Sequence, residues 1–189
     1  MNKSKKKKKP LRIKPDWKWI WTISGSTVVI SSAMSFLSGE VLSAGGMLLS
    51  ALVLLSIILL GIVFDILGMA VTAADEKPFH SMAAKKVPEA STALRLLRRA
   101  ERVSSFCNDV VGDICGVISG SAAAIIAASA IVNMEPGLAQ LVQLLMSAIV
   151  AALTVGGKAF GKSIAMNNSE QIIHAAAKVI YRVKHIFGK

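Results

Sequence analysis

The chain has 189 residues, of which 53% are hydrophobic and 17% are charged, and its net charge is +11 at pH 7. A soluble domain usually carries about a quarter charged residues. In a soluble protein this basic excess would suggest nucleic acid. Here long apolar runs indicate instead a membrane protein whose basic segments face an anionic leaflet, so we expect no nucleic-acid partner.

The first 40 residues predict a basic tail followed by a membrane helix. Residues 1–16 are rich in lysine and contain two prolines, a composition typical of disorder, so we expect a disordered basic cytoplasmic tail. Three tryptophans follow within residues 17–21, where an aromatic belt would lie at a membrane interface. We therefore expect residues 17–40 to form an N-terminal transmembrane helix.

Three further apolar segments are long enough to cross a membrane. The run at 41–63 carries no charged side chain, about 20 such residues span the ~30 Å hydrocarbon core, and we expect this span to continue to about residue 74. The segments 106–132 and 138–165 predict two more spans joined by a tight outer turn. The fold class is therefore expected to be an all-α membrane protein with four transmembrane helices.

Two amphipathic segments accompany these spans. Within 79–104, leucines recur on one face and arginines on the other, which predicts two short helices separated near Pro88. Residues 169–187 predict another basic amphipathic helix. We expect both segments to be juxtamembrane cytoplasmic helices that lie on the anionic inner leaflet.

The distribution of basic residues predicts the topology. Lys and Arg number nine in residues 1–18, seven in 74–105 and six from 158 onward, which accounts for all 22. The two outer turns contain only the acidic residues Glu40 and Glu135. By the positive-inside rule, we expect a multi-pass protein of the cell membrane with both termini cytoplasmic.

Four charged residues fall inside predicted spans, where each costs at least ~2.5 kcal/mol on insertion scales. They are Asp65, Asp109, Asp113 and Lys158, and all lie at a similar distance from the cytoplasmic end of their helices. Together with the amide of Asn108, the carboxylates predict an oxygen-rich site suited to Mg²⁺. The alternative is a buried ion pair in which Lys158 is the internal counter-charge of one aspartate.

Small residues form a second pattern in the last two spans. Gly112, Gly116 and Gly120 repeat every four residues, as do Gly157 and Gly161. Such stripes let helix backbones approach closely. They predict either ordinary packing within the chain or the seam of a homodimer.

The order of spans and amphipathic helices over residues 48–187 resembles the transmembrane domain of the CNNM/CorC (CorB) magnesium transporters. Residues 64–72 (FDILGMAVT) resemble the family's FSGSETALT, and residues 106–112 (FCNDVVG) resemble its IGNNLVN. Residues 157–165 (GKAFGKSIA) resemble its GEIxPKTxA. The resemblance implies a CNNM/CorC-like domain at 41–189, preceded by an extra helix, and a homodimer that binds Mg²⁺ between helices.

The chain departs from the family at positions that carry its ion chemistry. The family's acid in the first motif is Gly68 here, the acid in the last motif is Lys158, and the kinking proline is Gly161. Asn108 is retained. We expect the chain to lack the pair of CBS domains that usually follows in the family.

Three functions are compatible with these residues. The first is transport of Mg²⁺ or Co²⁺ by a homodimer. The second is a non-transporting membrane scaffold or regulator in which Lys158 replaces the bound cation. The third is a holin-like membrane-active protein, which the basic tail and the Ser- and Gly-rich spans allow. We expect no enzyme, because no nucleophile and base occur in a recognisable arrangement.

Overall fold

The computed structural model describes residues 17–44, 46–132 and 134–187. The predicted tail at 1–16 lies outside these residues. The described chain is helical and contains no strand, in agreement with the expected all-α class.

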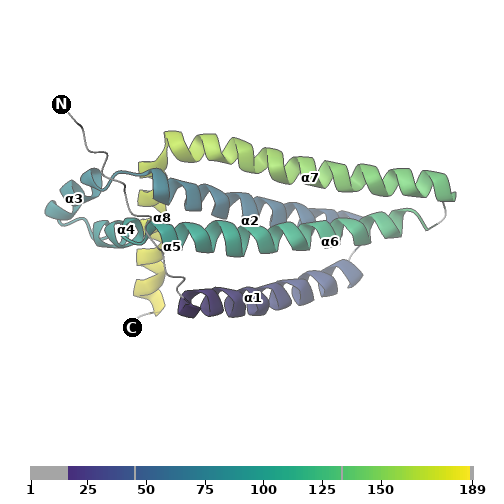
Figure 1. Cartoon of the computed structure of the whole chain (residues 1–189), viewed down its shortest axis with the longest axis horizontal. Coiled ribbons are helices and arrows are strands. Elements are labelled where there is room, and N and C mark those ends of the chain that lie inside the picture. The colour runs from purple at the N-terminus through teal and green to yellow at the C-terminus, as the bar shows by residue number, and fades with distance from the viewer. Residues whose placement is uncertain (1–16, 45, 133, 188–189) are drawn as a thin grey trace, which may run out of the picture.

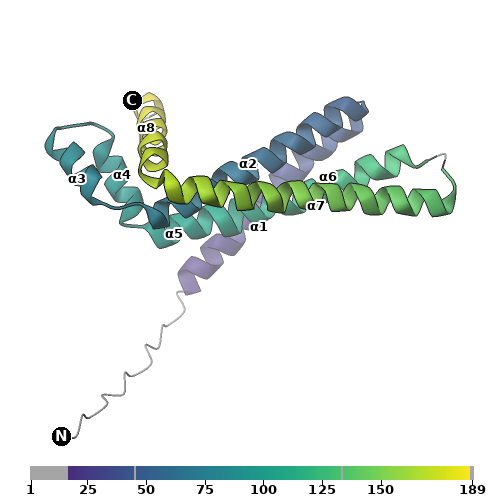
Figure 2. The ribbon, with the colours of Figure 1, turned by 90° about the horizontal axis from the view of Figure 1, so that it is seen from above.

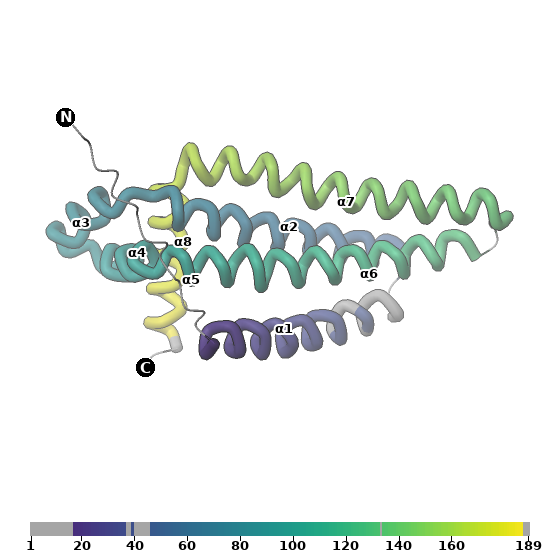
Figure 3. The backbone as a smooth tube through the Cα atoms, viewed as in Figure 1, coloured from purple at the N-terminus to yellow at the C-terminus, as the bar shows by residue number. Residues whose placement is uncertain are grey.

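Four long helices form the body of the molecule (Figure 1). They are α1 (Trp17–Ala44), α2 (Met47–Ala73), α6 (Asp113–Ala130) and α7 (Pro136–Asn167). Successive helices run in opposite directions along the bundle, as the tube in Figure 3 traces. Helix α2 packs against both α6 and α7, while α1 packs on the side formed by α6 and α2.

Three helical segments are long and apolar enough to cross a membrane, which agrees with the expected membrane protein. They are α2 with 27 residues, Ala100–Ala130 with 31 and α7 with 32. The expected span at 17–40 is described as helix α1, which continues to Ala44, so residues 41–44 belong to this helix and not to the next span as predicted. Helix α1 is not among these three, so its role as a fourth span stays a prediction.

One end of the bundle carries the remaining helices, and we call it the basal end. It holds α3 (Lys77–Ala84), α4 (Ala90–Leu97), α5 (Ala100–Ser105) and α8 (Ser169–Phe187). The chain turns between α3 and α4 at Lys86, whose φ of 58° is in the left-handed region. Helix α8 runs across the bundle rather than along it, as the two views in Figures 1 and 2 agree.

Three apolar clusters hold the molecule together. The basal cluster joins α2, α3, α4, α7 and α8 around the buried side chains of Val71, Phe79, Leu97 and Ile173. Two further clusters fill the space between the long helices, and residues of α1 pack against only one of them. The guanidinium of Arg102 lies 5.1 Å from the ring centroid of Trp19, which ties α1 to α5.

The third expected span begins earlier than its apolar residues indicate. The sequence predicted a start at Phe106, whereas the helical path begins at Ala100 and runs through α5 and a π-helical segment, η1 (Phe106–Gly112), into α6. No proline interrupts residues 100–130, so the helix continues from the polar basal end into the apolar span.

Candidate functional site

An ion pair joins two of the membrane-length helices. Lys158 of α7 lies with its Nζ 3.3 Å from Oδ1 of Asp65 on α2, and the two side chains are 26% and 21% exposed. Water is scarce around both groups, so the pair interacts more strongly than one at an aqueous surface. Of the two interpretations of these charges, the structure has the paired arrangement.

Gly112 provides the room for this pair. A Cβ atom at Gly112 would lie 2.8 Å from Oδ1 of Asp65 and 3.3 Å from Nζ of Lys158. Only a residue without a side chain lets η1 approach so closely. Three membrane-length segments therefore meet at one carboxylate and one ammonium group.

Asn108 occupies a second close contact, between η1 and α2. A Cβ at Gly68 would overlap the Asn108 amide, so this glycine lets the side chain lie against the α2 backbone. The amide Nδ2 donates to Oγ of Ser104 over 3.2 Å, whereas the buried Oδ1 has no partner within the described chain.

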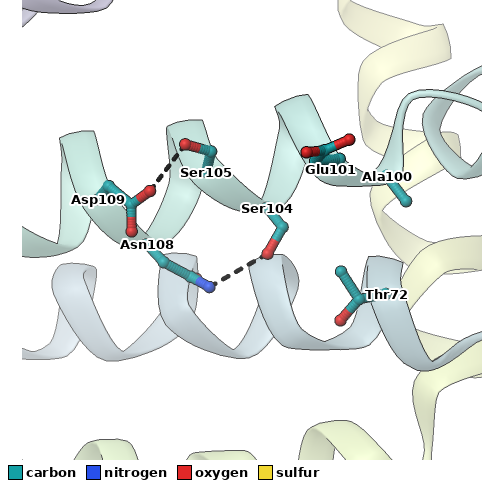
Figure 4. Close-up of a pocket in the computed structure, with 7 residues that line it drawn as sticks. All are labelled: Thr72, Ala100, Glu101, Ser104, Ser105, Asn108 and Asp109. Carbon is teal, nitrogen blue, oxygen red and sulfur yellow. Dashed lines mark hydrogen bonds between the residues drawn. The ribbon is translucent and has the colours of Figure 1, made fainter. Parts of the chain in front are cut away.

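A cavity of about 440 Å³ opens beside Asn108 at the basal end (Figure 4). Apart from Ala100, its lining consists of oxygen-bearing side chains: Thr72, Glu101, Ser104, Ser105, Asn108 and Asp109. Thr72 comes from α2, and the others come from the helical path that begins at α5 (Figure 4). The hydroxyl of Ser105 donates to Oδ2 of Asp109 over 2.7 Å, which fixes that carboxylate at the cavity wall.

The carboxylates continue beyond this cavity along one side of the helix. Glu101, Ser105, Asp109 and Asp113 follow one another at intervals of four residues, so they lie on successive turns. All three acidic residues are exposed. The stripe therefore leads from the basal end into the segment that is long enough to cross a membrane.

The structure divides the predicted site into separate parts. Asp65 and Lys158 contact each other, Asn108 and Asp109 line the cavity, and Asp113 is exposed on the first turn of α6. Within the described residues, no group of three or more His, Cys, Asp or Glu side chains is arranged to hold a metal ion. A cation bound here would need neutral oxygen ligands or water as well.

The predicted packing glycines also fall into two groups. Gly157 and Gly161 face Ile62 and Ile66 of α2 at distances that leave no room for a Cβ. Gly112 likewise has no room for a Cβ beside the ion pair. Gly116 and Gly120 have nothing within 4 Å of such an atom.

Those two glycines instead line a groove of about 220 Å³ between α6 and α7. The other lining residues are small or aliphatic, Ser119, Ala123, Ser147, Val150, Ala151, Thr154 and Val155. The groove is therefore a place where a further helix could approach the α6 backbone closely.

Sequence reasoning missed two close approaches and part of the cavity. A Cβ at Gly61 would lie 2.9 Å from that of Cys115, and Gly68 receives Asn108. Both glycines belong to α2 and are seven residues apart, which is about two helical turns. This spacing places them on one face of the helix and could have predicted a close approach there. Glu101 and Thr72 carried no such pattern, because they come from different segments.

No protein-family model, curated protein or solved structure matches this chain.

Proposed function

We propose that the chain is a multi-pass protein of the cell membrane that transports a divalent cation, Mg²⁺ or Co²⁺, as a homodimer with a CNNM/CorC-like core. The observation that carries this proposal is the basal cavity lined by two carboxylates, three hydroxyls and one amide. Mg²⁺ is commonly bound through one or two carboxylates and keeps several of its waters. A cavity of about 440 Å³ has room for such a hydrated ion.

The orientation in this proposal has the basal end in the cytoplasm. The described basic residues of α3, α4, α5 and α8 all belong to that end, and basic residues favour the cytoplasmic side. Trp17 and Trp21 are 65% and 74% exposed at the start of α1, as expected for side chains at a membrane interface. With α1 as a fourth span, the acidic cavity opens toward the cytoplasm.

The exposed stripe supports the homodimer in this proposal. Asp109 and Asp113 lie on the same helical stripe as Gly116 and Gly120, since the intervals are four, three and four residues. A carboxylate exposed to lipid is costly, whereas one that faces a partner or a water-filled path is not. A second copy seated on this face would cover the aspartates and fill the groove between α6 and α7.

The ion pair favours a second candidate, a membrane scaffold or regulator that does not transport. The Lys158 ammonium lies where the resemblance implies a bound cation, and it already neutralises Asp65. In this alternative, the charge between the helices is a fixed part of the chain and no ion passes.

Thermal unfolding of the purified full chain in detergent tests cation binding. A ligand that binds only the folded state at about one hundred times its Kd adds about 2.7 kcal/mol to the free energy of unfolding. Millimolar MgCl₂ should therefore raise the melting temperature of the wild type, and Asp109→Asn should weaken that response. Glu135→Gln is the control, because it removes a carboxylate far from the cavity. Sodium chloride at equal ionic strength excludes a general salt effect.

Uptake of Mg²⁺ into vesicles that contain the protein then separates the two candidates. Uptake above that of empty vesicles is expected for a transporter. Binding without uptake would favour the regulator. The absence of both binding and uptake would contradict the transport proposal. Lys158→Glu restores the family's acid beside Asp65. Under either candidate, this variant should bind more Mg²⁺ than the wild type if the chain retains the family's ion site between the helices.

A further inference from the structure

Two neighbouring cavities lie on a part of the basal end separate from the acidic cavity, one beside α4 and the other between α4 and α8. One has a volume of about 410 Å³ and the other about 290 Å³, and both are lined by Ser91 and Arg95. Arg98 and Arg99 complete the basic lining of the first, while Lys184 lines the second. Four cationic side chains from α4, the turn after it and α8 therefore line these two adjoining cavities.

These cations have no carboxylate partners in the part of the chain that the structure describes. Neither cavity has an acidic residue in its lining, and Arg95 forms no ion pair there. Glu89 lies at the start of α4, but its Oε1 contacts Nε2 of His174 at 3.4 Å, and its side chain is only 17% exposed. The positive charge is thus available to an anion from outside the chain.

Neutral donors and a fixed ring pair lie beside the cations. Thr92 and Tyr181 bring hydroxyl groups to the second cavity. The rings of Tyr181 and His185 stack, with centroids 6.1 Å apart and an interplanar angle of 9°. Hydroxyl and guanidinium donors together match the several acceptor oxygens of a phosphate group.

We propose that α4 and α8 form a binding site for a phosphate-bearing anion. The phosphate comes either from the headgroup of an anionic phospholipid or from a soluble polyphosphate. The exposed apolar side chains of α8 favour the first source. Val179, Ile180, Val183 and Ile186 are exposed on this helix, which crosses the end of the bundle (Figure 2) and could lie at the boundary between headgroups and acyl chains.

The site differs from a diffuse attraction between a basic surface and a negative membrane. Diffuse attraction depends on the number of basic residues near the membrane surface, and each of them contributes about equally to the binding free energy. A site depends on the particular side chains that surround the phosphate. Two double variants that remove equal charge distinguish the two cases. Arg95→Gln/Arg98→Gln changes the cavities, whereas Lys85→Gln/Lys178→Gln changes exposed lysines outside them.

The experiment measures the melting temperature of the full chain in a neutral detergent as each probe is added. The probes are dioctanoyl phosphatidylglycerol and sodium pyrophosphate, with dioctanoyl phosphatidylcholine and sodium chloride as their respective controls. At least one probe should raise the melting temperature of the wild type and of Lys85→Gln/Lys178→Gln. Arg95→Gln/Arg98→Gln should require at least about tenfold more probe for the same rise.

A response to phosphatidylglycerol alone assigns the site to a lipid headgroup, and a response to pyrophosphate alone assigns it to a soluble phosphate. Lys184→Gln changes the cavity from the α8 side. It should weaken the rise in melting temperature, and it provides an independent test if the arginine variant does not fold. The proposal is overturned if neither probe stabilises the wild type, or if the control double variant loses as much response as the arginine variant.

Discussion

Nζ of Lys158 lies 3.3 Å from Oδ1 of Asp65, and Gly112 leaves the space in which both groups fit. One contact thus links α7, α2 and η1. Each group is about three-quarters shielded from solvent, so loss of either partner leaves an uncompensated charge in a poorly solvated place.

Removal of either partner should therefore destabilise the protein, and the losses from the two single removals should not add. We expect Lys158→Met and Asp65→Leu each to lower the free energy of unfolding by about 1–3 kcal/mol. The double variant should lose less than the sum of the two, with a coupling of about 1 kcal/mol or more. Thermal unfolding in detergent measures all three, and Lys162→Met on the exposed side of α7 is the control. Additive losses would show that the pair does not interact.

Gly112 should tolerate no side chain. Gly112→Ala places a Cβ against Asp65 and Lys158, and we expect a loss of about 1–3 kcal/mol from the resulting displacement. Gly156→Ala on α7 is the matched control, because nothing lies within 4 Å of its added atom, and alanine favours a helix by about 1 kcal/mol over glycine. Equal melting temperatures for the two variants would contradict the close approach at η1.

Gly68 and Asn108 should behave as a steric pair. Gly68→Ala brings a methyl group into the Asn108 amide and is expected to cost about 1–3 kcal/mol. When Asn108→Ala is added, the obstruction disappears, so the double variant should be more stable than Gly68→Ala alone. Thermal unfolding of the two single variants and the double variant checks this order. No recovery in the double variant would show that Asn108 does not lie against α2.

The proposed homodimer depends on the groove between α6 and α7. Gly120→Leu should obstruct a second copy and weaken dimerisation by about tenfold or more, which corresponds to about 1.4 kcal/mol. Light scattering during gel filtration measures the mass, with Gly25→Leu as the control at an exposed glycine of α1. A monomeric wild type, or an unchanged dimer in Gly120→Leu, would exclude this face as the seam.

The sequence predicted the helices well because their signals are local. Long uncharged runs mark α2 and α7, and Pro88 marks the break between α3 and α4. The start of α5 was harder to predict. Polar residues at 100–105 continue the same helix as the apolar ones that follow, and hydropathy alone does not reveal that continuity.

The site was predicted in its residues but not in its arrangement. Spacing along a helix gives the depth of Asp65, Asp109 and Lys158, but depth does not say which way each side chain faces. That direction depends on how each helix is rotated about its axis, which is set by contacts such as Ile62 against Gly157. Consequently two of the four charges pair between the helices, while Asp109 and Asp113 are exposed.

The π-helical turn at Phe106–Gly112 has a consequence for how the length of this region can vary. A π turn holds one residue more than an α turn. Deletion of one residue there would restore regular α geometry and leave α5 in nearly the same rotation relative to α6, because the residue removed is the extra one. Glu101 and Ser105 would then stay on the side of the helix that they share with Asp113. A single-residue deletion should thus be tolerated better in this turn than in the regular turns of α6, where it would rotate everything before it by roughly 100°.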